Sequence, residues 1–185
     1  VEHKFADGQF NLENLGPKIQ EQMDMLSIKT LKGILVVSGP GRFTSIRLGI
    51  TVAKAFASVL GCPLVGIHSL KALLLSYPGT KETCLLALEL KPKQFYMALG
   101  GGESPRLFSE PMLLEQEGLI NLLEKSSDDM LLLSHKKIVL SQDDKGLIKQ
   151  KQRVLPFSSF ALAYSLDQSL QSKKKPESVV PNYVF

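Results

Sequence analysis

The chain has 185 residues, 44% of them hydrophobic and 22% charged, which is the balance of a soluble globular protein with one domain or two small ones. The net charge is only +4, no apolar run reaches the roughly 18 residues of a membrane helix, and the opening VEHKFADGQF holds no apolar signal segment. Composition therefore disfavours a membrane or secreted protein, and we expect a cytoplasmic one.

The first part of the chain alternates between helices and strands. A strand fragment is predicted over residues 1–10, and an amphipathic helix over Leu12–Leu26, with Asn11 as N-cap and Pro17 inside the pattern. The elements predicted next are the buried strand Gly33–Val37, the helix Thr44–Leu60 capped by Thr44 and stopped by Gly61, the strand Pro63–Ile67 and the short helix Ser69–Leu75. This alternation favours an α/β layer with parallel strand pairs.

The helix predicted over Thr44–Leu60 is apolar around most of its surface. Ile50 and Val52, for example, lie on nearly opposite sides of it, yet both are apolar. A helix of this kind is buried on more than one side.

The clearest boundary in the chain is Tyr77-Pro78-Gly79-Thr80. After it, TCLLALEL and QFYMALG are separated by Lys91-Pro92-Lys93 and predict a hairpin or two adjacent strands. The remaining predicted elements are a strand at RLFS, the helix Glu115–Lys125, the strands Met130–Leu133 and Ile138–Leu140, and the last helix Ser158–Ser172, followed by a tail anchored by Pro181, Tyr183 and Phe185.

The thiols and imidazoles do not form a metal-binding pattern. Cys62 and Cys84 each lie in an apolar stretch, which predicts buried free thiols rather than a disulfide. The histidines are dispersed at His3, His68 and His135, and no short ligand spacing occurs. We therefore expect no metal site. The lysines of the 173–175 cluster are read as a solvated helix end, with weak tRNA contact as the alternative.

The stretch Ser38-Gly39-Pro40-Gly41 joins a predicted strand directly to a predicted helix. A phosphate-binding P-loop would need a lysine, and a dinucleotide fingerprint would need a third glycine where Thr44 stands. Two interpretations remain: a structural corner, in which Gly41 takes a backbone conformation that a Cβ would make costly, or an anion contact at the helix N-terminus. The candidate anion- or nucleotide-contact residues are Gly39, Gly41, Arg42 and Thr44.

Other catalytic patterns are weaker. Ser38 and His68 do not form a recognisable dyad in sequence, and Glu89 ends an apolar strand, where a partly exposed carboxylate is expected. The aspartate pairs at 128–129 and 143–144 lie in polar turns and are expected at the surface.

The stretch Gly39–Leu73, GPGRFTSIRLGITVAKAFASVLGCPLVGIHSLKAL, resembles the signature of the bacterial TsaB/YeaZ family. The family pattern runs Gly-Pro-Gly-Ser-Phe-Thr-Gly-Leu-Arg-Ile-Gly, then Ala-Lys-Gly-Leu-Ala, then Pro-Leu-Val-Gly-Val-Ser-Ser-Leu. This chain departs from it at Arg42 and Ser45, where the pattern has Ser and Gly. Looser likeness extends over most of the chain.

The resemblance implies an α/β protein with the ASKHA (actin-like ATPase) fold, built from two α/β lobes with mixed sheets. We expect an N-terminal lobe over residues 1–78, a C-terminal lobe over 79–157, and a helix and tail over 158–185 that pack back on the body. The family usually opens with a strand carrying Asp-Thr-Ser, followed by a hairpin, so the first strand is expected to be missing here. Because that strand faces the nucleotide in related folds, its absence weakens the prediction of a nucleotide-binding site.

The resemblance also implies a role in placing the threonylcarbamoyl group on the adenosine next to the tRNA anticodon. In that role the chain is a non-catalytic subunit that dimerises with a TsaD-type catalytic subunit, works with a TsaE-type ATPase and forms a homodimer when alone. No cofactor is expected on this chain alone, with ATP or ADP entering at the level of the complex. The implied partner interface, on two helices, comprises Leu12, Leu15, Ile19, Met23, Arg47, Ile50 and Lys54.

Two alternatives stay open at this stage. An ATP-dependent enzyme of the sugar-kinase kind has the same fold, but it would need a carboxylate base and metal-binding acids, for which only Glu89 is a candidate. A metallopeptidase is disfavoured by the dispersed histidines.

Overall fold

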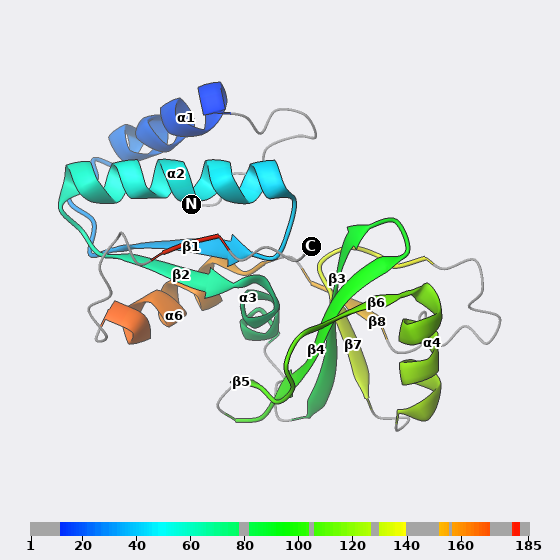
Figure 1. Cartoon of the computed structure of the whole chain (residues 1–185). Coiled ribbons are helices and arrows are strands. Elements are labelled where there is room, and N and C mark those ends of the chain that lie inside the picture. Colours follow the sequence, from blue (N-terminus) through cyan, green and yellow to red (C-terminus); the bar gives the residue numbers. More distant parts are fainter. Residues whose placement is uncertain are drawn as a thin grey trace. The chain divides into compact units, whose positions relative to one another are not determined.

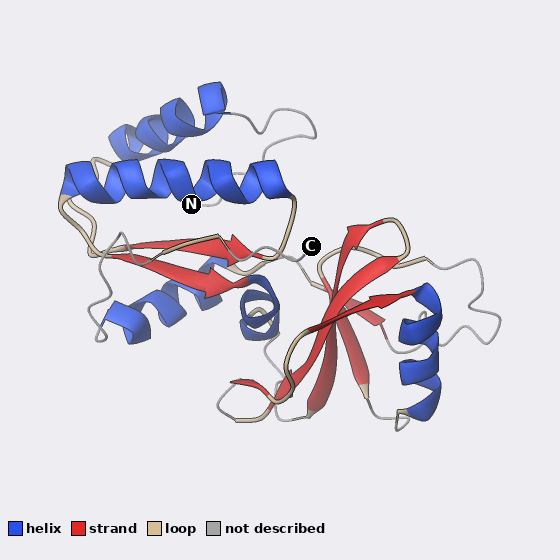
Figure 2. Cartoon of the chain, viewed as in Figure 1, coloured by secondary structure: helices blue, strands red, loops and turns tan. Residues whose placement is uncertain are grey.

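A computed structural model of the chain describes residues 12–77, 82–103, 106–126, 130–139, 152–155, 157–170 and 179–181. The predictions made for residues 1–11, the aspartate pairs, the lysine cluster at 173–175, and Tyr183 and Phe185 lie outside these residues. Helices and strands alternate along much of the described chain (Figures 1 and 2). In order they are α1 (Leu12–Met25), β1 (Ile34–Gly39), α2 (Phe43–Leu60), β2 (Leu64–His68), α3 (Ser69–Leu75), β3 (Thr83–Lys91), β4 (Gln94–Gly101), β5 (Arg106–Leu107), β6 (Met112–Glu115), α4 (Gln116–Lys125), β7 (Leu131–Ser134), β8 (Gln152–Val154) and α6 (Ser159–Leu170).

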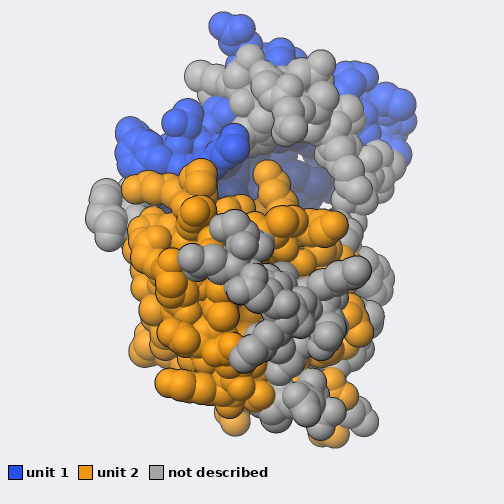
Figure 3. Space-filling model, turned by 90° about the vertical axis from the view of Figure 1, so that its right-hand side faces the viewer, with its two compact units in different colours: residues 1–68, 163–183, 185 blue, residues 69–162, 184 orange. Residues whose placement is uncertain are grey.

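The chain divides into two compact units, which Figure 3 distinguishes by colour. Unit 1 comprises residues 1–68, 163–183 and 185, and unit 2 comprises residues 69–162 and 184. The C-terminal part of the chain is thus shared between the two units. The division falls after His68, before α3, whereas the turn signals of the sequence lie about one short helix later, around Pro78.

Unit 1 is built on a parallel pair of strands, β1 and β2, in which Leu35 lies opposite Val65 and Gly39 opposite His68. A parallel pair needs a crossover connection, and α2 provides it. α2 packs along β1, and α1 packs on α2 (Figure 1). Near the start of β1, Leu166 and Leu170 of α6 approach Gly33.

α2 is buried on two sides, as the sequence predicts. Ile50 and Ala57 belong to the core of unit 1, and Val52, on another side of the helix, is only 7% exposed. By length and composition alone α2 could also cross a membrane, the one such helix in the described part of the chain. The core helix of a globular unit can pass the same test, so it is weak evidence for a membrane span, and five residues of α2 are buried in unit 1.

Unit 2 is built on a six-stranded mixed sheet with the strand order β5-β4-β3-β7-β8, in which β6 also pairs with β4. The antiparallel hairpin β3–β4 is the one predicted from sequence, with Leu86 opposite Ala98. β7 and β8 add to the other side of β3 as parallel strands.

The sheet of unit 2 has a hydrophobic core on each face. Successive side chains of a strand point to opposite faces, so Leu85 and Ala87 of β3 pack with Leu119 and Leu123 of α4. Their neighbour Leu86 packs on the other face, against the helix α3. A strand covered on both faces reads as a continuous apolar run, which is what TCLLALEL shows.

Several predicted boundaries are corrected by the structure. Ile138–Val139 is irregular rather than a strand, and the strands β6 and β8 were not predicted. RLFS contributes only the two residues of β5. Cys62 and Cys84 are buried free thiols, as predicted, and burial raises the pKa of both.

Candidate functional site

The glycine corner between β1 and α2 is a tight turn in which Gly39, not Gly41, has the unusual backbone. Gly39 has φ 108°, a region that residues with a Cβ avoid, and its peptide bond to Pro40 is cis. Gly41 has no positive φ, and a Cβ there would approach only the tip of the Ile46 side chain, at 3.3 Å. The expectation that Gly41 holds the strained position is therefore wrong, and Gly39 holds it.

The helix α2 begins at Phe43, one residue earlier than predicted. Arg42 is its N-cap residue, with φ −59° and ψ 121°, and no side chain caps the helix. Thr44 therefore lies within the first turn and is not the N-cap. At the other end the prediction is confirmed: Gly61 is left-handed, with φ 62° and ψ 27°, and the helix stops there.

The four candidate anion-contact residues lie close together in sequence at this corner. Gly41, Arg42 and Thr44 are exposed, whereas Gly39 is buried at the end of β1. Amide groups in the first turn of a helix have no partner inside the helix and attract negative charge. An anion could reach the start of α2 at the exposed residues Arg42 and Thr44, and the anion contact stays a prediction.

Two polar side chains lie at the corner: His68, which the sequence did not join to it, and Ser38, which belongs to the corner stretch. His68 ends β2 opposite Gly39, and burial lowers the pKa of its imidazole. Ser38, just before Gly39, donates its hydroxyl to the carbonyl of Ile67 at 3.2 Å. Strand pairing therefore brings Ser38 near His68 despite their separation in sequence, but the serine hydroxyl is directed to the backbone and not to a base.

The predicted partner-interface residues divide into buried and accessible sets. Ile50 is 3% exposed and Met23 8% exposed, so both are packed inside unit 1 and are not available on its surface. Leu15, Ile19 and Lys54 are half-buried, and Arg47 is exposed. The side chain of Leu12 lies outside the described residues.

A groove of about 330 Å³ lies between α1, α2 and β1, and part of the apolar surface of the two helices lines it. Leu15 and Ile19 of α1 and Val52 and Phe56 of α2 line it. The apolar side of α1 therefore faces α2 and β1 within the unit.

α2 also carries a row of exposed residues that winds around the helix axis, because each step of four residues turns about 40°. Its residues recur every four positions and all are exposed, which defines what we call the outward face of α2: Phe43, Arg47, Thr51, Ala55 and Val59. Val59 is 85% exposed and Phe43 50% exposed. The guanidinium of Arg47 lies over the Phe43 ring, 5.1 Å from its centroid. Of the residues predicted for the interface, Arg47 is the one on this face.

The described residues include no group of three or more histidine, cysteine, aspartate or glutamate side chains able to hold a metal ion. Glu89, the one carboxylate considered as a catalytic base, is exposed near the end of β3 and accepts the backbone N–H of Lys93 at 3.3 Å.

The parallel strand pair of unit 1 and the mixed six-stranded sheet of unit 2, each packed with helices, agree with the actin-like ASKHA fold. The chain belongs to the TsaD family, tRNA N6-adenosine threonylcarbamoyltransferase, whose sequence model matches residues 10–106.

Individual relatives agree with this assignment. The tRNA N6-adenosine threonylcarbamoyltransferase of Thermosipho africanus is 30% identical over 125 residues, which is 64% of this chain and 33% of that protein. The enzyme of the same name from Geobacillus thermodenitrificans is 26% identical over 121 residues, 64% of this chain and 32% of that protein. The chain thus spans about a third of the length of these curated relatives.

Among solved structures, YeaZ from Pseudomonas aeruginosa is similar over 98% of this chain and 88% of that chain, with a TM-score of 0.73 and 16% sequence identity. At this identity the likeness concerns the fold. It confirms the fold that the resemblance to the TsaB/YeaZ family implies.

Proposed function

We propose that this chain is a non-catalytic, cytoplasmic partner subunit in the formation of N6-threonylcarbamoyladenosine in tRNA, and that it acts by dimerising with a TsaD-type catalytic subunit. Membership of the TsaD family and the YeaZ fold support involvement in this modification. The non-catalytic role rests on the resemblance of Gly39–Leu73 to the TsaB/YeaZ signature. A TsaE-type ATPase is the further partner, and the chain pairs with itself when alone.

The outward face of α2 is the observation that carries the dimerisation part of the proposal. Thr51, Ala55 and Val59 lie on one exposed side of α2, within about 80° around its axis, so a second helix can approach the small side chains of Thr51 and Ala55 closely, beside Val59. Met25 and Leu26, at the end of α1, add two further exposed apolar side chains in unit 1, at 71% and 48%. Exposed large apolar side chains of this kind are typical of an interaction surface.

The burial of the predicted interface residues narrows the set that can contact a partner. Ile50 and Met23 stabilise unit 1 from inside, because both are buried in it. The contact with a partner is therefore assigned to Arg47 and its neighbours on the outward face. A charged substitution at buried Ile50 would unfold unit 1, so a loss of dimerisation in that variant would not identify an interface residue.

The proposal is tested by reconstitution. The TsaD-type catalytic subunit, tRNA and threonylcarbamoyl-adenylate are combined with and without this chain, and the modified nucleoside is measured by mass spectrometry of digested tRNA. We expect modification with both proteins and little with either alone. Equal modification without this chain, or modification by this chain unaided, would contradict the proposal.

A further inference from the structure

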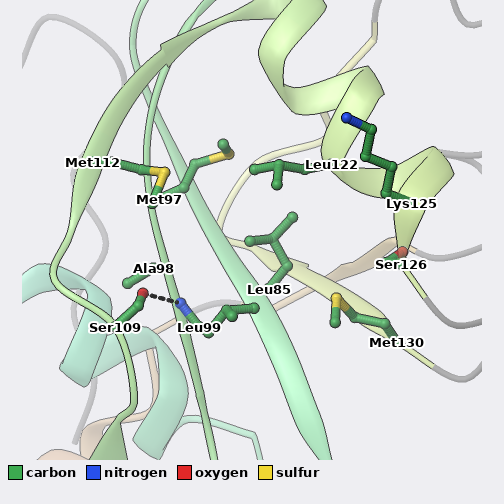
Figure 4. Close-up of a pocket in the computed structure, with 10 residues that line it drawn as sticks. All are labelled: Leu85, Met97, Ala98, Leu99, Ser109, Met112, Leu122, Lys125, Ser126 and Met130. Atoms are coloured by element: carbon green, nitrogen blue, oxygen red, sulfur yellow. Dashed lines mark hydrogen bonds between the residues drawn. The ribbon is translucent and has the colours of Figure 1, made fainter.

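Unit 2 contains a cavity of about 230 Å³ between its sheet and α4 (Figure 4). Its inner wall is formed by buried side chains, with Leu85 on β3 and Met97 on β4. At its mouth, Met112 of β6 is 44% exposed and Leu122 of α4 is 37% exposed. The cavity therefore opens to solvent past an apolar rim.

The two serine hydroxyls that line this cavity already have backbone partners. Ser109 Oγ accepts the N–H of Leu99 at 3.0 Å, as Figure 4 shows, and the hydroxyl of Ser126 donates to the carbonyl of Leu123 at 2.7 Å. Among the lining residues that the structure describes, Lys125 is the one with a charged side chain. It follows Leu122 by three positions on α4, so the two are neighbours on the helix surface.

We propose that this cavity binds a small amphiphilic anion, whose apolar body fills the interior and whose carboxylate pairs with the amine of Lys125 at the mouth. An apolar cavity of about 150 Å³ holds a benzene molecule. By that measure this one holds an apolar body of roughly eight or nine non-hydrogen atoms, the size of a medium-chain acyl group. The charge of the ligand follows from Lys125, since the serines are turned to the backbone.

The methionines of the cavity suit a ligand of this kind. Met97, Met112 and Met130 line it from three segments of unit 2. Methionine side chains are flexible and polarizable, so they adapt to a chain that enters between them. The site lies within unit 2 and is separate from the outward face of α2, so it is independent of the proposed role in tRNA modification.

The test uses octanoate as the anionic probe and octanamide as its neutral counterpart, added to the full chain with 13C-labelled methionine methyl groups. We expect octanoate to shift the methyl signals of Met97, Met112 and Met130 in a saturable way and to bind about threefold more tightly than octanamide, the range of a solvent-exposed ion pair. Lys125→Gln should lower the affinity for octanoate to that for octanamide. The exposed Lys91, which does not line the cavity, supplies the control Lys91→Gln, which should change neither affinity.

Two results would overturn the proposal. The first is the absence of saturable shifts at the three methyl groups with octanoate. The second is equal binding of both probes that Lys125→Gln leaves unchanged, because the cavity would then select no charge.

Discussion

The two units bury their strands to different extents. In unit 2, the five consecutive residues Cys84–Leu88 of β3 are all buried, with a hydrophobic core on each face. In unit 1, the five residues Ile34–Ser38 of β1 are all only half-buried, although four of them are apolar. Unit 1 also carries the outward face of α2, with its exposed phenylalanine and valine.

This difference concerns how completely each unit covers its central strand. In the described part of the chain, the central strand β3 of unit 2 is covered on both faces, whereas the apolar side chains of β1 in unit 1 stay partly accessible. Surface of that kind favours association. The following predictions test the contrast, beginning with the largest expected effect.

The first prediction compares leucines on the two sheets. Leu86→Ala in β3 should lower the free energy of unfolding by about 2–5 kcal/mol, because Leu86 is fully buried and its loss leaves a cavity. Leu35→Ala in half-buried β1 should cost less than half as much. Urea denaturation of each variant measures both values. An equal or larger loss at Leu35 would show that β1 is packed as completely as β3.

The second prediction concerns the corner of unit 1. Gly39→Ala should destabilise the protein by about 1–3 kcal/mol, because its φ of 108° is strained for a residue with a Cβ. Gly41→Ala is the matched control and should cost clearly less, since its Cβ would meet only a side-chain tip. Thermal melts of the two variants give the comparison. If Gly41→Ala proved the more damaging, the strained position would have been assigned to the wrong glycine.

The third prediction uses two adjacent valines near the C-terminus. Val179 is 4% exposed and belongs to the core of unit 1, whereas Val180 is 65% exposed. Val179→Ala should cost about 1.5 kcal/mol, the value of two buried carbon groups. Val180→Ala should change stability by less than about 0.5 kcal/mol. Equal melting temperatures of the two variants would mean that the segment does not contribute to the core.

The smallest expected effect is the loss of stability when the pH is lowered. Burial lowers the pKa of His68 in unit 1 and of His135 in unit 2, the latter also through Lys136. The unfolded chain therefore binds more protons than the folded one just below the ordinary histidine pKa, and stability falls as the pH drops below about 6.5. His68→Gln should flatten this dependence between about pH 5 and 6.5, before most carboxylates titrate. If the slope of stability against pH were unchanged in both His68→Gln and His135→Gln, the assignment of this pH dependence to the buried histidines would be contradicted.

Much of this contrast could be predicted from sequence, because hydrophobic patterning is strong where burial is complete. The apolar runs TCLLALEL and QFYMALG predicted two paired strands, and the all-round apolar α2 predicted burial on two sides. The prediction of a buried strand over Gly33–Val37 is wrong in its burial, because β1 is only half-buried. By contrast, β8 is the three-residue segment Gln152-Arg153-Val154, whose pairing depends on β7 and not on its own pattern. Ile138 and Val139 alternate between buried and exposed as in a strand, yet they lie outside any strand.

The site was predictable in location but not in detail. The glycine corner stands where the sequence placed it, since only glycine tolerates the turn. Which glycine is strained depends on the path of the backbone, and which side of α2 faces outward depends on where α1 packs. Ile50 and Val59 are both apolar residues of α2, and only the structure shows that one is buried and the other exposed.

The most direct test of the central claim is the affinity of this chain for a TsaD-type catalytic subunit, measured by calorimetry for two matched variants. Val59→Glu places a charge on the outward face of α2, and Val139→Glu places one at a similarly exposed valine of unit 2, at 85% and 76% exposure. Both variants should fold, because neither side chain is buried. We predict that Val59→Glu weakens the heterodimer at least tenfold, about 1.4 kcal/mol, and that Val139→Glu leaves it unchanged. Unchanged affinity for Val59→Glu, or equal loss in both variants, would contradict the assignment of the partner interface to α2.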